Sequence, residues 1–167
     1  MRIDRGIVLA AGASKRLGSH KALIEVEGKT LVQLVCSKLQ SAGLSVTVVT
    51  RNSLEQKIEN LLPNVSTVVN PNPELGRTGT IQRGIESIGA GPLLIAPVDR
   101  PGFSLETINL LCETNTTTIP TYKEKGGHPI AITSQDCENI LQAEPDIPLR
   151  ELISPEKMQV EDPHLHL

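Results

Sequence analysis

The sequence predicts one α/β domain with a mostly parallel sheet and helices on both faces. Runs of strand length alternate with segments of helical spacing, and several of these runs are apolar at every position. Strands that are apolar on both faces are typical of parallel sheets covered by helices. The length of 167 residues fits a single domain. We therefore expect one domain over residues 1–167.

The first half of the chain predicts three strands and three helices. The apolar run 5–10 is a strand, and Thr30 begins a helix over 31–39 that Gly43 ends. The β-branched run 45–50 is the next strand. Ser53 and Gln56 form a capping-box pattern before a helix over 54–62. A strand over 65–70 and a helix over 80–88 follow.

The second half continues the alternation. Strands are expected at 92–96, 117–120, 128–133 and 157–160, and helices at 104–113 and 134–142. Ser104 is the expected N-cap of the first of these helices.

Composition excludes several classes of function. The net charge of −3 and the pI near 5.8 argue against a general nucleic-acid or anionic-membrane surface. Tyr122 and Phe103 are the only aromatic residues, so stacking on bases is not expected. The three cysteines are far apart and suggest neither disulfides nor a zinc site. The apolar run 7–13 is too short for a membrane span, and a cytoplasmic protein is expected.

A basic turn follows the first strand. Residues 12–21 carry Lys15, Arg16 and Lys21 with no acid, and Gly12 and Gly18 allow the backbone to approach a ligand closely. Backbone N–H groups beside cations suit a polyphosphate. A solvated basic surface turn is the alternative.

Two common phosphate-binding motifs are excluded by spacing. Five residues separate Gly12 from Gly18, and Ser19-His20 follow, so no Walker A loop is present there. The triplet 28–30 (Gly-Lys-Thr) lacks the earlier glycine and is interpreted as a turn with Thr30 as helix cap. The dinucleotide fingerprint G-x-G-x-x-G is also missing after Leu9.

Further polar groups follow later strands. In LLIAPVDRP a buried strand delivers Asp99 to the carboxyl edge of the sheet, where a carboxylate can hold Mg²⁺; the alternative is a turn residue or a partner for Arg100. The NPNPELGRTGT stretch places Arg77 and neighbouring groups at a helix start, where they could bind a nucleotide or form an ordinary turn. In KGGHP, His128 and its glycines could face an acceptor substrate or form a tight turn. The basic turn and Asp99 together indicate a nucleotide with a metal ion.

Three stretches in this order and spacing resemble the MobA-like NTP transferase family: GIVLAAGASKRLGSHK, PVDRP and GGHPI. Within the family they are most similar to the branch of molybdenum cofactor cytidylyltransferases (MocA-like). The resemblance covers nearly the whole chain. It implies a Rossmann-like nucleotidyltransferase fold of the glycosyltransferase A type, with Mg²⁺ as cofactor and a nucleoside triphosphate and a molybdopterin-type acceptor as partners.

The resemblance also implies roles for individual residues. Arg16, Lys21 and Asp99 would be catalytic, with the two cations on the triphosphate and Asp99 on the metal. Ala11 and the His-Pro pair are similar to the CTP-using branch. The residues implied to bind nucleotide are Leu9, Ala10, Ala11, Gly12, Ser14, Arg16, Lys21, Gly76, Thr78, Gly79 and Thr80. Those implied to face the acceptor are Gly127, His128 and Pro129.

One departure from the family pattern concerns the last residues. The family continues into a segment whose aspartate supplies a second metal ligand, and we expect that this sequence lacks that segment. Glu161, Asp162, His164 and His166 are candidate substitutes, although a disordered or structural segment is the expectation. Arg100 stands where relatives often have an apolar residue.

Three functions stay open. The first is a nucleotidyltransferase that uses CTP, or alternatively a guanylyl- or sugar-phosphate nucleotidyltransferase. The second is a nucleotide-binding protein without turnover, and the third is a module that delivers or matures a molybdenum enzyme.

Overall fold

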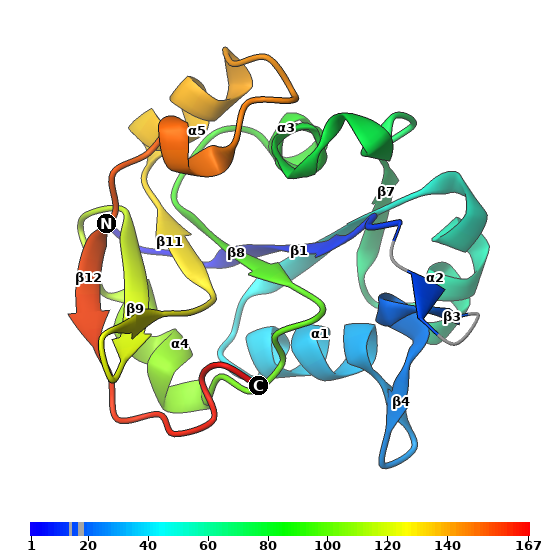
Figure 1. The fold of residues 1–167 in the computed structure, drawn as a ribbon, viewed down its shortest axis with the longest axis horizontal. Helices are drawn as coiled ribbons and strands as arrows, with labels where there is room; N and C mark the ends of the chain where they lie inside the picture. The colour runs from blue at the N-terminus through cyan, green and yellow to red at the C-terminus, as the bar shows by residue number, and fades with distance from the viewer. Residues whose placement is uncertain (14, 17–18) are drawn as a thin grey trace.

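The computed structural model describes residues 1–13, 15–16 and 19–167, without the side chains of residues 15, 16 and 19. Its main sheet has eight strands in the order β10-β9-β11-β8-β1-β6-β7, with β12 beside β9 (Figure 1). The strands are β1 (Arg5–Ala10), β6 (Ser45–Thr50), β7 (Ser66–Val69), β8 (Leu93–Pro97), β9 (Thr118–Tyr122), β10 (Lys125–Gly126), β11 (Ile130–Ile132) and β12 (Glu156–Gln159). All of the strands expected from the sequence are present.

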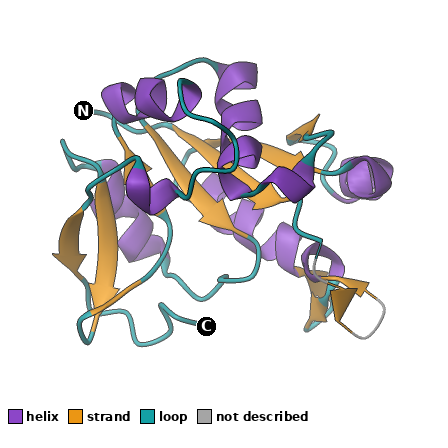
Figure 2. Cartoon of the chain, turned by 45° about the horizontal axis from the view of Figure 1, so that its top comes forward, coloured by secondary structure: helices purple, strands orange, loops and turns teal. Residues whose placement is uncertain are grey.

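Helices cover both faces of this sheet (Figure 2). α1, α2 and α4 pack on one face, and α3 and α5 pack on the other. The helices are α1 (Leu31–Ser41), α2 (Glu55–Leu61), α3 (Arg77–Ile88), α4 (Leu105–Cys112) and α5 (Ser134–Leu141). Short 3₁₀ turns are η1 (Lys21–Leu23), η2 (Asn52–Leu54), η3 (Pro73–Leu75) and η4 (Leu149–Glu151).

The centre of the sheet is parallel and one side is mixed. β1 pairs parallel with both β6 and β8, and β6 pairs parallel with β7. β11 runs antiparallel to β8 and β9 because the chain returns from β9 through a tight turn, in which Lys123 and Glu124 have φ values of 51° and 67°. The predicted mostly parallel α/β fold is confirmed.

Capping explains where several helices begin. Thr30 accepts a hydrogen bond from Gln33 N and forms a capping box at α1, which confirms the cap predicted there. Ser104 likewise caps α4. The capping box predicted at Ser53 and Gln56 is wrong: η2 occupies this position, and Leu54, which has no side-chain hydrogen bond to offer, precedes α2.

Two small hairpins between β1 and α1 were not predicted. The first pairs β2 (Lys15–Arg16) with β3 (Ser19–His20), and the second pairs β4 (Glu25–Val26) with β5 (Lys29–Thr30). The turn of the second hairpin uses positive φ at Glu27 (52°) and Gly28 (86°). Each strand has two residues, too few to give a recognisable hydrophobic alternation.

The core consists mainly of aliphatic side chains, with Phe103 fully buried among them. In the described part of the chain, no helix is both long and apolar enough to cross a membrane.

Candidate functional site

A pocket of about 220 Å³ lies at the carboxyl edge of the parallel strands. β1 and β8 end at it, and the turns that follow them supply much of its wall. Its lining residues are Leu9, Ala10, Ala11, Gly12, His20, Lys21, Ala22, Leu54, Pro73, Gly76, Arg77, Thr80, Pro97, Val98 and Asp99. Ligands of open α/β sheets bind at this edge.

Lys21 and Asp99 meet in this pocket. Lys21 Nζ lies 3.5 Å from Asp99 Oδ2, and the two side chains are 30% and 29% exposed. Lys21 begins η1 after the basic turn, whereas Asp99 follows β8. Two groups 78 residues apart in sequence therefore open onto one cavity. Asp99 pairs with Lys21 and not with its sequence neighbour Arg100, which was the alternative partner.

The end of β1 and the glycine turn that follows it (residues 9–12) line the pocket beside this pair. Leu9 and Ala10 end β1, and with Ala11 and Gly12 they all line the pocket. Among the described residues, no atom lies within 4 Å of a Cβ placed on Gly12. Ser14 lies outside the described residues, as does the side chain of Arg16. The predicted roles of these two residues remain predictions.

The start of α3 forms another wall of the pocket. Of the residues predicted there to bind nucleotide, two line this pocket and two bond to a neighbouring loop. Gly76 and Thr80 line the pocket. Thr78 is buried and donates a hydrogen bond to Ile147 O (2.5 Å). Gly79 N donates to Pro145 O (3.2 Å), so these two residues anchor the helix to the loop after α5.

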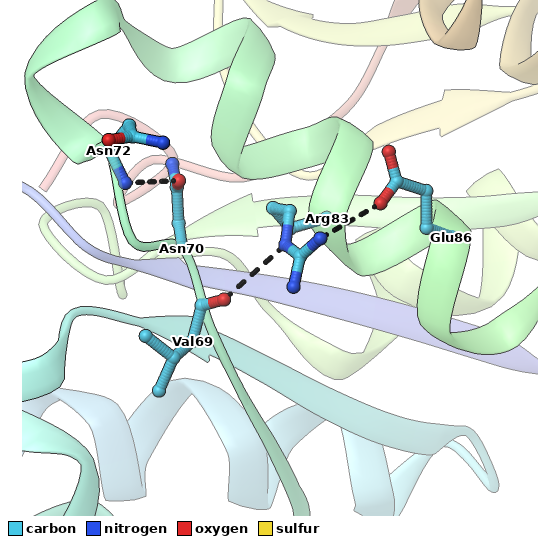
Figure 3. A network of polar contacts seen from close by, with 5 residues as sticks. All are labelled: Val69, Asn70, Asn72, Arg83 and Glu86. Carbon is cyan, nitrogen blue, oxygen red and sulfur yellow. Dashed lines mark hydrogen bonds and ion pairs between the residues drawn. The ribbon is translucent and has the colours of Figure 1, made fainter.

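A polar network holds α3 against the end of β7 (Figure 3). Arg83 reaches back from α3 to Val69 O (3.4 Å) and also pairs with Glu86. Asn70 accepts from Asn72 N (3.0 Å) and donates to Thr80 Oγ1 (3.0 Å). The buried Asn70 thereby fixes the loop that delivers Gly76 to the pocket.

A second pocket of about 410 Å³ adjoins the first and shares Leu9, Gly76, Arg77 and Pro97 with it. Its other lining residues are Thr78, Ile81, Ile95, His128, Ile130, Pro145, Asp146, Ile147, Pro148, Leu149 and Arg150. Of the three residues predicted to face an acceptor, His128 lines this pocket. Gly127 lies under Leu165 and Pro129 is buried, and neither lines either pocket.

His128 is neutral at physiological pH. The pKa of His128 is lowered to about 4, mainly by burial and also by the positive charges of Arg77 and Arg100, while the negative charge of Asp99 acts in the opposite direction. Among the described residues, its buried Nδ1 has no hydrogen-bond partner. As a residue of the pocket wall, the neutral imidazole can hydrogen-bond to a ligand that enters the second pocket.

The carboxylate of Asp99 fits a Mg²⁺ ion held jointly with a bound phosphate. Within the described residues, no group of three or more His, Cys, Asp or Glu side chains is arranged to hold a metal by itself. Mg²⁺ is commonly bound by one or two carboxylates, with substrate phosphates and waters completing its shell. One half-buried carboxylate on the wall of this pocket meets that requirement.

Two of the four candidate substitutes for a second metal ligand, Asp162 and His166, have structural contacts instead. Asp162 is 4% exposed and accepts hydrogen bonds from Ser104 N and Thr107 Oγ1 at the start of α4. His166 Nε2 lies 3.3 Å from Tyr122 O. Glu161 and His164 are exposed, and none of the four lines either pocket. The expectation of a structural segment therefore agrees with these contacts.

Several lining residues were not predicted. Leu54 follows β6, and the carboxyl-edge rule applied to every parallel strand would have found it. His20 and Ala22 flank Lys21 on the pocket wall. The loop 145–150 had no sequence signal, because its position depends on how α5 packs against α3.

The fold and the site together define an α/β protein with a nucleotidyltransferase-type fold and a pocket at its sheet edge that contains both cationic and anionic side chains. The chain belongs to the MobA-like NTP transferase family, whose domain model matches residues 6–161. This match confirms the family expected from the sequence.

Individual relatives agree with this assignment. The chain is similar to a probable molybdenum cofactor guanylyltransferase of Bacillus cereus (strain G9842), with 32% identity over 111 residues, 65% of this chain and 54% of the relative. It thus spans about half the length of the curated relatives that it matches.

Two solved structures share the fold. One is Rv0371c from Mycobacterium tuberculosis in complex with manganese (TM-score 0.79, 16% identity, 96% of this chain and 89% of that chain). The other is a nucleotidyl transferase from Methanothermobacter (TM-score 0.77, 21% identity, 96% of this chain and 89% of that chain).

Proposed function

We propose that this chain transfers a nucleoside monophosphate from a nucleoside triphosphate to a phosphorylated acceptor of the molybdopterin type, with release of pyrophosphate. The observation that carries the proposal is the convergence of Lys21 and Asp99 on one pocket beside the glycine turn. The second pocket, which shares Arg77 with the first, gives the acceptor a place next to the triphosphate.

The chemistry follows from the groups present. An acceptor phosphate oxygen attacks the α-phosphorus, and a new P–O bond forms. The bond from the α-phosphorus to the oxygen bridging to the β-phosphorus breaks, and its electron pair leaves with pyrophosphate. Because a phosphate monoester is already anionic at pH 7, this step requires no general base.

Each part of the site has a role in this reaction. Lys21 binds the negative phosphates and stabilises the charge that grows on the leaving group. Asp99 would hold Mg²⁺, which when bound supplies charge neutralisation and orients the phosphates. Gly12 leaves room for the triphosphate, and the neutral His128 donates or accepts a hydrogen bond at the acceptor.

Two donors are supported by different observations. Ala11 lines the first pocket and is similar to the CTP-using branch, so CTP is the donor that we propose. The names of the curated relatives favour a second candidate, GTP. A match in name transfers less directly than a residue on the pocket wall, since the relatives match over about half of their length.

Transfer and binding assays test the proposal. The protein is incubated with Mg²⁺, molybdopterin and either CTP or GTP labelled at the α-phosphate, and labelled dinucleotide and pyrophosphate are measured. We expect transfer from CTP and a matching rise in melting temperature with CTP. Transfer from GTP alone would overturn the CTP assignment. Binding without transfer would favour a nucleotide-binding protein, and no binding of any nucleotide would overturn the function.

A further inference from the structure

A lysine of α1 donates hydrogen bonds to the loop that carries Asp99. Lys38 Nζ donates hydrogen bonds to Phe103 O (2.9 Å) and to Pro101 O, and it lies 5.2 Å from the centre of the Phe103 ring. Burial lowers the pKa of Lys38, and the negative charge of Asp162 partly offsets this. A partly buried ammonium group is thus committed to two backbone carbonyls of the loop 99–104.

A carboxylate binds the same loop at its last residue, at the peptide group whose carbonyl Lys38 contacts. Asp162 Oδ2 accepts hydrogen bonds from Ser104 N (2.9 Å) and from Thr107 Oγ1 (2.7 Å). Burial alone would raise the pKa of Asp162, but the hydrogen bonds from Thr107 and Ser104 lower it below its usual value. The ionised carboxylate therefore fixes the point at which the loop enters α4.

The backbone of residues 161–167 closes over the middle of the loop. Gly102 N donates to Leu167 O (3.0 Å), and a Cβ at Gly102 would lie 2.0 Å from His164 O. Figure 1 shows these last residues beside the loop that leaves β8. Only glycine permits such a close approach of the two backbones.

The same residues also contact the loop that leads to His128. Leu165 is fully buried, and its Cγ would lie 2.6 Å from a Cβ at Gly127. His166 Nε2 lies 3.3 Å from Tyr122 O, at the end of β9. The segment 161–167 therefore lies against both loops that reach the two pockets.

We propose that Lys38 and Asp162 are positioning residues, which hold the loop 99–104 so that the Asp99 carboxylate stays on the pocket wall next to Lys21. This inference rests on the proposed function of Asp99. Buried or half-buried charges are costly unless they are satisfied, and packing alone would need only neutral side chains. Lys38 bonds to two main-chain carbonyls of this irregular loop, and Asp162 bonds to its last main-chain N–H as well as to the Thr107 side chain of α4. Such contacts are expected where a functional group has to be placed accurately.

Conservative variants with a matched control test the proposal. Lys38→Met keeps the aliphatic stem, Asp162→Asn keeps the shape, and Lys38→Arg keeps the charge and hydrogen-bond donors. Asp136→Asn is the control, because Asp136 also accepts hydrogen bonds from a threonine and an amide (Thr117 and Asn139) at the start of a helix, α5, but lines neither pocket. For each protein we would measure Mn²⁺ affinity in the presence of nucleotide, kcat and KM, and unfolding by denaturant.

We expect Lys38→Met and Asp162→Asn to weaken Mn²⁺ binding and to lower kcat by about tenfold or more, as loss of a group that orients a metal ligand does. KM for the nucleotide should change little, Lys38→Arg should recover part of the loss, and Asp136→Asn should change stability only. Equal Mn²⁺ affinity and kcat in Asp162→Asn, Lys38→Met and the control would overturn the proposal.

Backbone amide exchange separates this result from a failure of the proposed function. If the wild-type protein transfers no nucleotide, the proposed function falls, but exchange still tests the positioning role. Faster exchange confined to residues 99–104 in Asp162→Asn and Lys38→Met supports it. Unchanged exchange in this loop, or an equal increase throughout the chain, overturns it.

Discussion

Lys21 Nζ lies 3.5 Å from Asp99 Oδ2, and each side chain is only about two-thirds buried. The opposite charges of the two groups partly cancel each other's electrostatic potential in the pocket. A phosphate that binds Lys21 and a metal ion that binds Asp99 therefore each compete with this ion pair. Ion pairs that are accessible to water contribute about 0–1 kcal/mol to stability. The pair is therefore better suited to binding than to holding the fold together.

Asp99→Asn should abolish nucleotide transfer while the protein stays folded. The amide keeps the size of the side chain but removes the charge that a metal ion needs. We expect the free energy of unfolding to change by no more than about 1 kcal/mol. Transfer of label from the α-phosphate and urea unfolding measure the two effects, and substantial turnover in this variant would remove Asp99 from the metal site.

Lys21→Ala should affect metal binding in the opposite direction. Without its cationic neighbour, Asp99 should bind Mn²⁺ at least as tightly as in the wild type, whereas kcat should fall about 10²–10³-fold, as for the loss of a group that stabilises transition-state charge. Lys29→Ala, at an exposed position of the β4–β5 hairpin, is the control. A Lys21→Ala protein with normal kcat would show that this ammonium group does not act on the phosphates.

His128 should make stability depend on pH. The pKa of His128 is lowered to about 4 in the folded protein, mainly by burial. Below pH about 6.5, the unfolded chain therefore binds a proton that the folded protein does not bind until the pH approaches 4. The contribution of neutral His128 is fully present above pH 6.5 and is lost as the pH falls toward 4. We expect the wild type to lose about 1 to 3 kcal/mol more than His128→Gln between pH 7 and pH 4.5.

Urea unfolding of both proteins across this pH range measures the difference, because the carboxylates titrate in both and cancel. His164→Asn, at an exposed position, should keep the wild-type profile. Parallel stability curves for wild type and His128→Gln would mean that His128 is not held neutral.

The sequence was sufficient to predict the central strands of the sheet and the two charged residues that meet in the candidate site. β1 and β6 have the bounds predicted from their apolar and β-branched runs, since buried parallel strands have a strong local signal. Lys21 and Asp99 were found because each directly follows a strand or its turn. Their contact could only be expected, because it depends on a loop held by Lys38 and residues 161–167.

Other features depend on tertiary contacts that have no local pattern. Thr78 and Gly79 look like nucleotide ligands in sequence, but their hydrogen bonds go to the loop after α5. Arg77, one residue before them, is the cation shared by both pockets. Nothing in a run of glycines, threonines and one arginine shows which member faces the cavity.

Two glycine-to-alanine changes should separate binding from stability. Gly12→Ala adds a methyl group on the pocket wall, with no atom of the described residues within 4 Å, so stability should change by less than about 1 kcal/mol while nucleotide affinity falls. Gly84→Ala places a Cβ 2.8 Å from Ile7 Cδ1 and 3.0 Å from Val49 Cγ2, where α3 packs on β1 and β6. Overpacking a core of this kind costs about 1–3 kcal/mol.

Nucleotide titration and urea unfolding of both variants make the comparison. We expect Gly84→Ala to keep nucleotide affinity at temperatures where it is folded, because Gly84 lines neither pocket. The reverse result, with Gly12→Ala unstable and fully active in binding, would show that the triphosphate does not approach this turn closely. A loss of affinity in Gly12→Ala alone would place the nucleotide against the backbone of residues 9–12, within reach of Lys21 and Asp99.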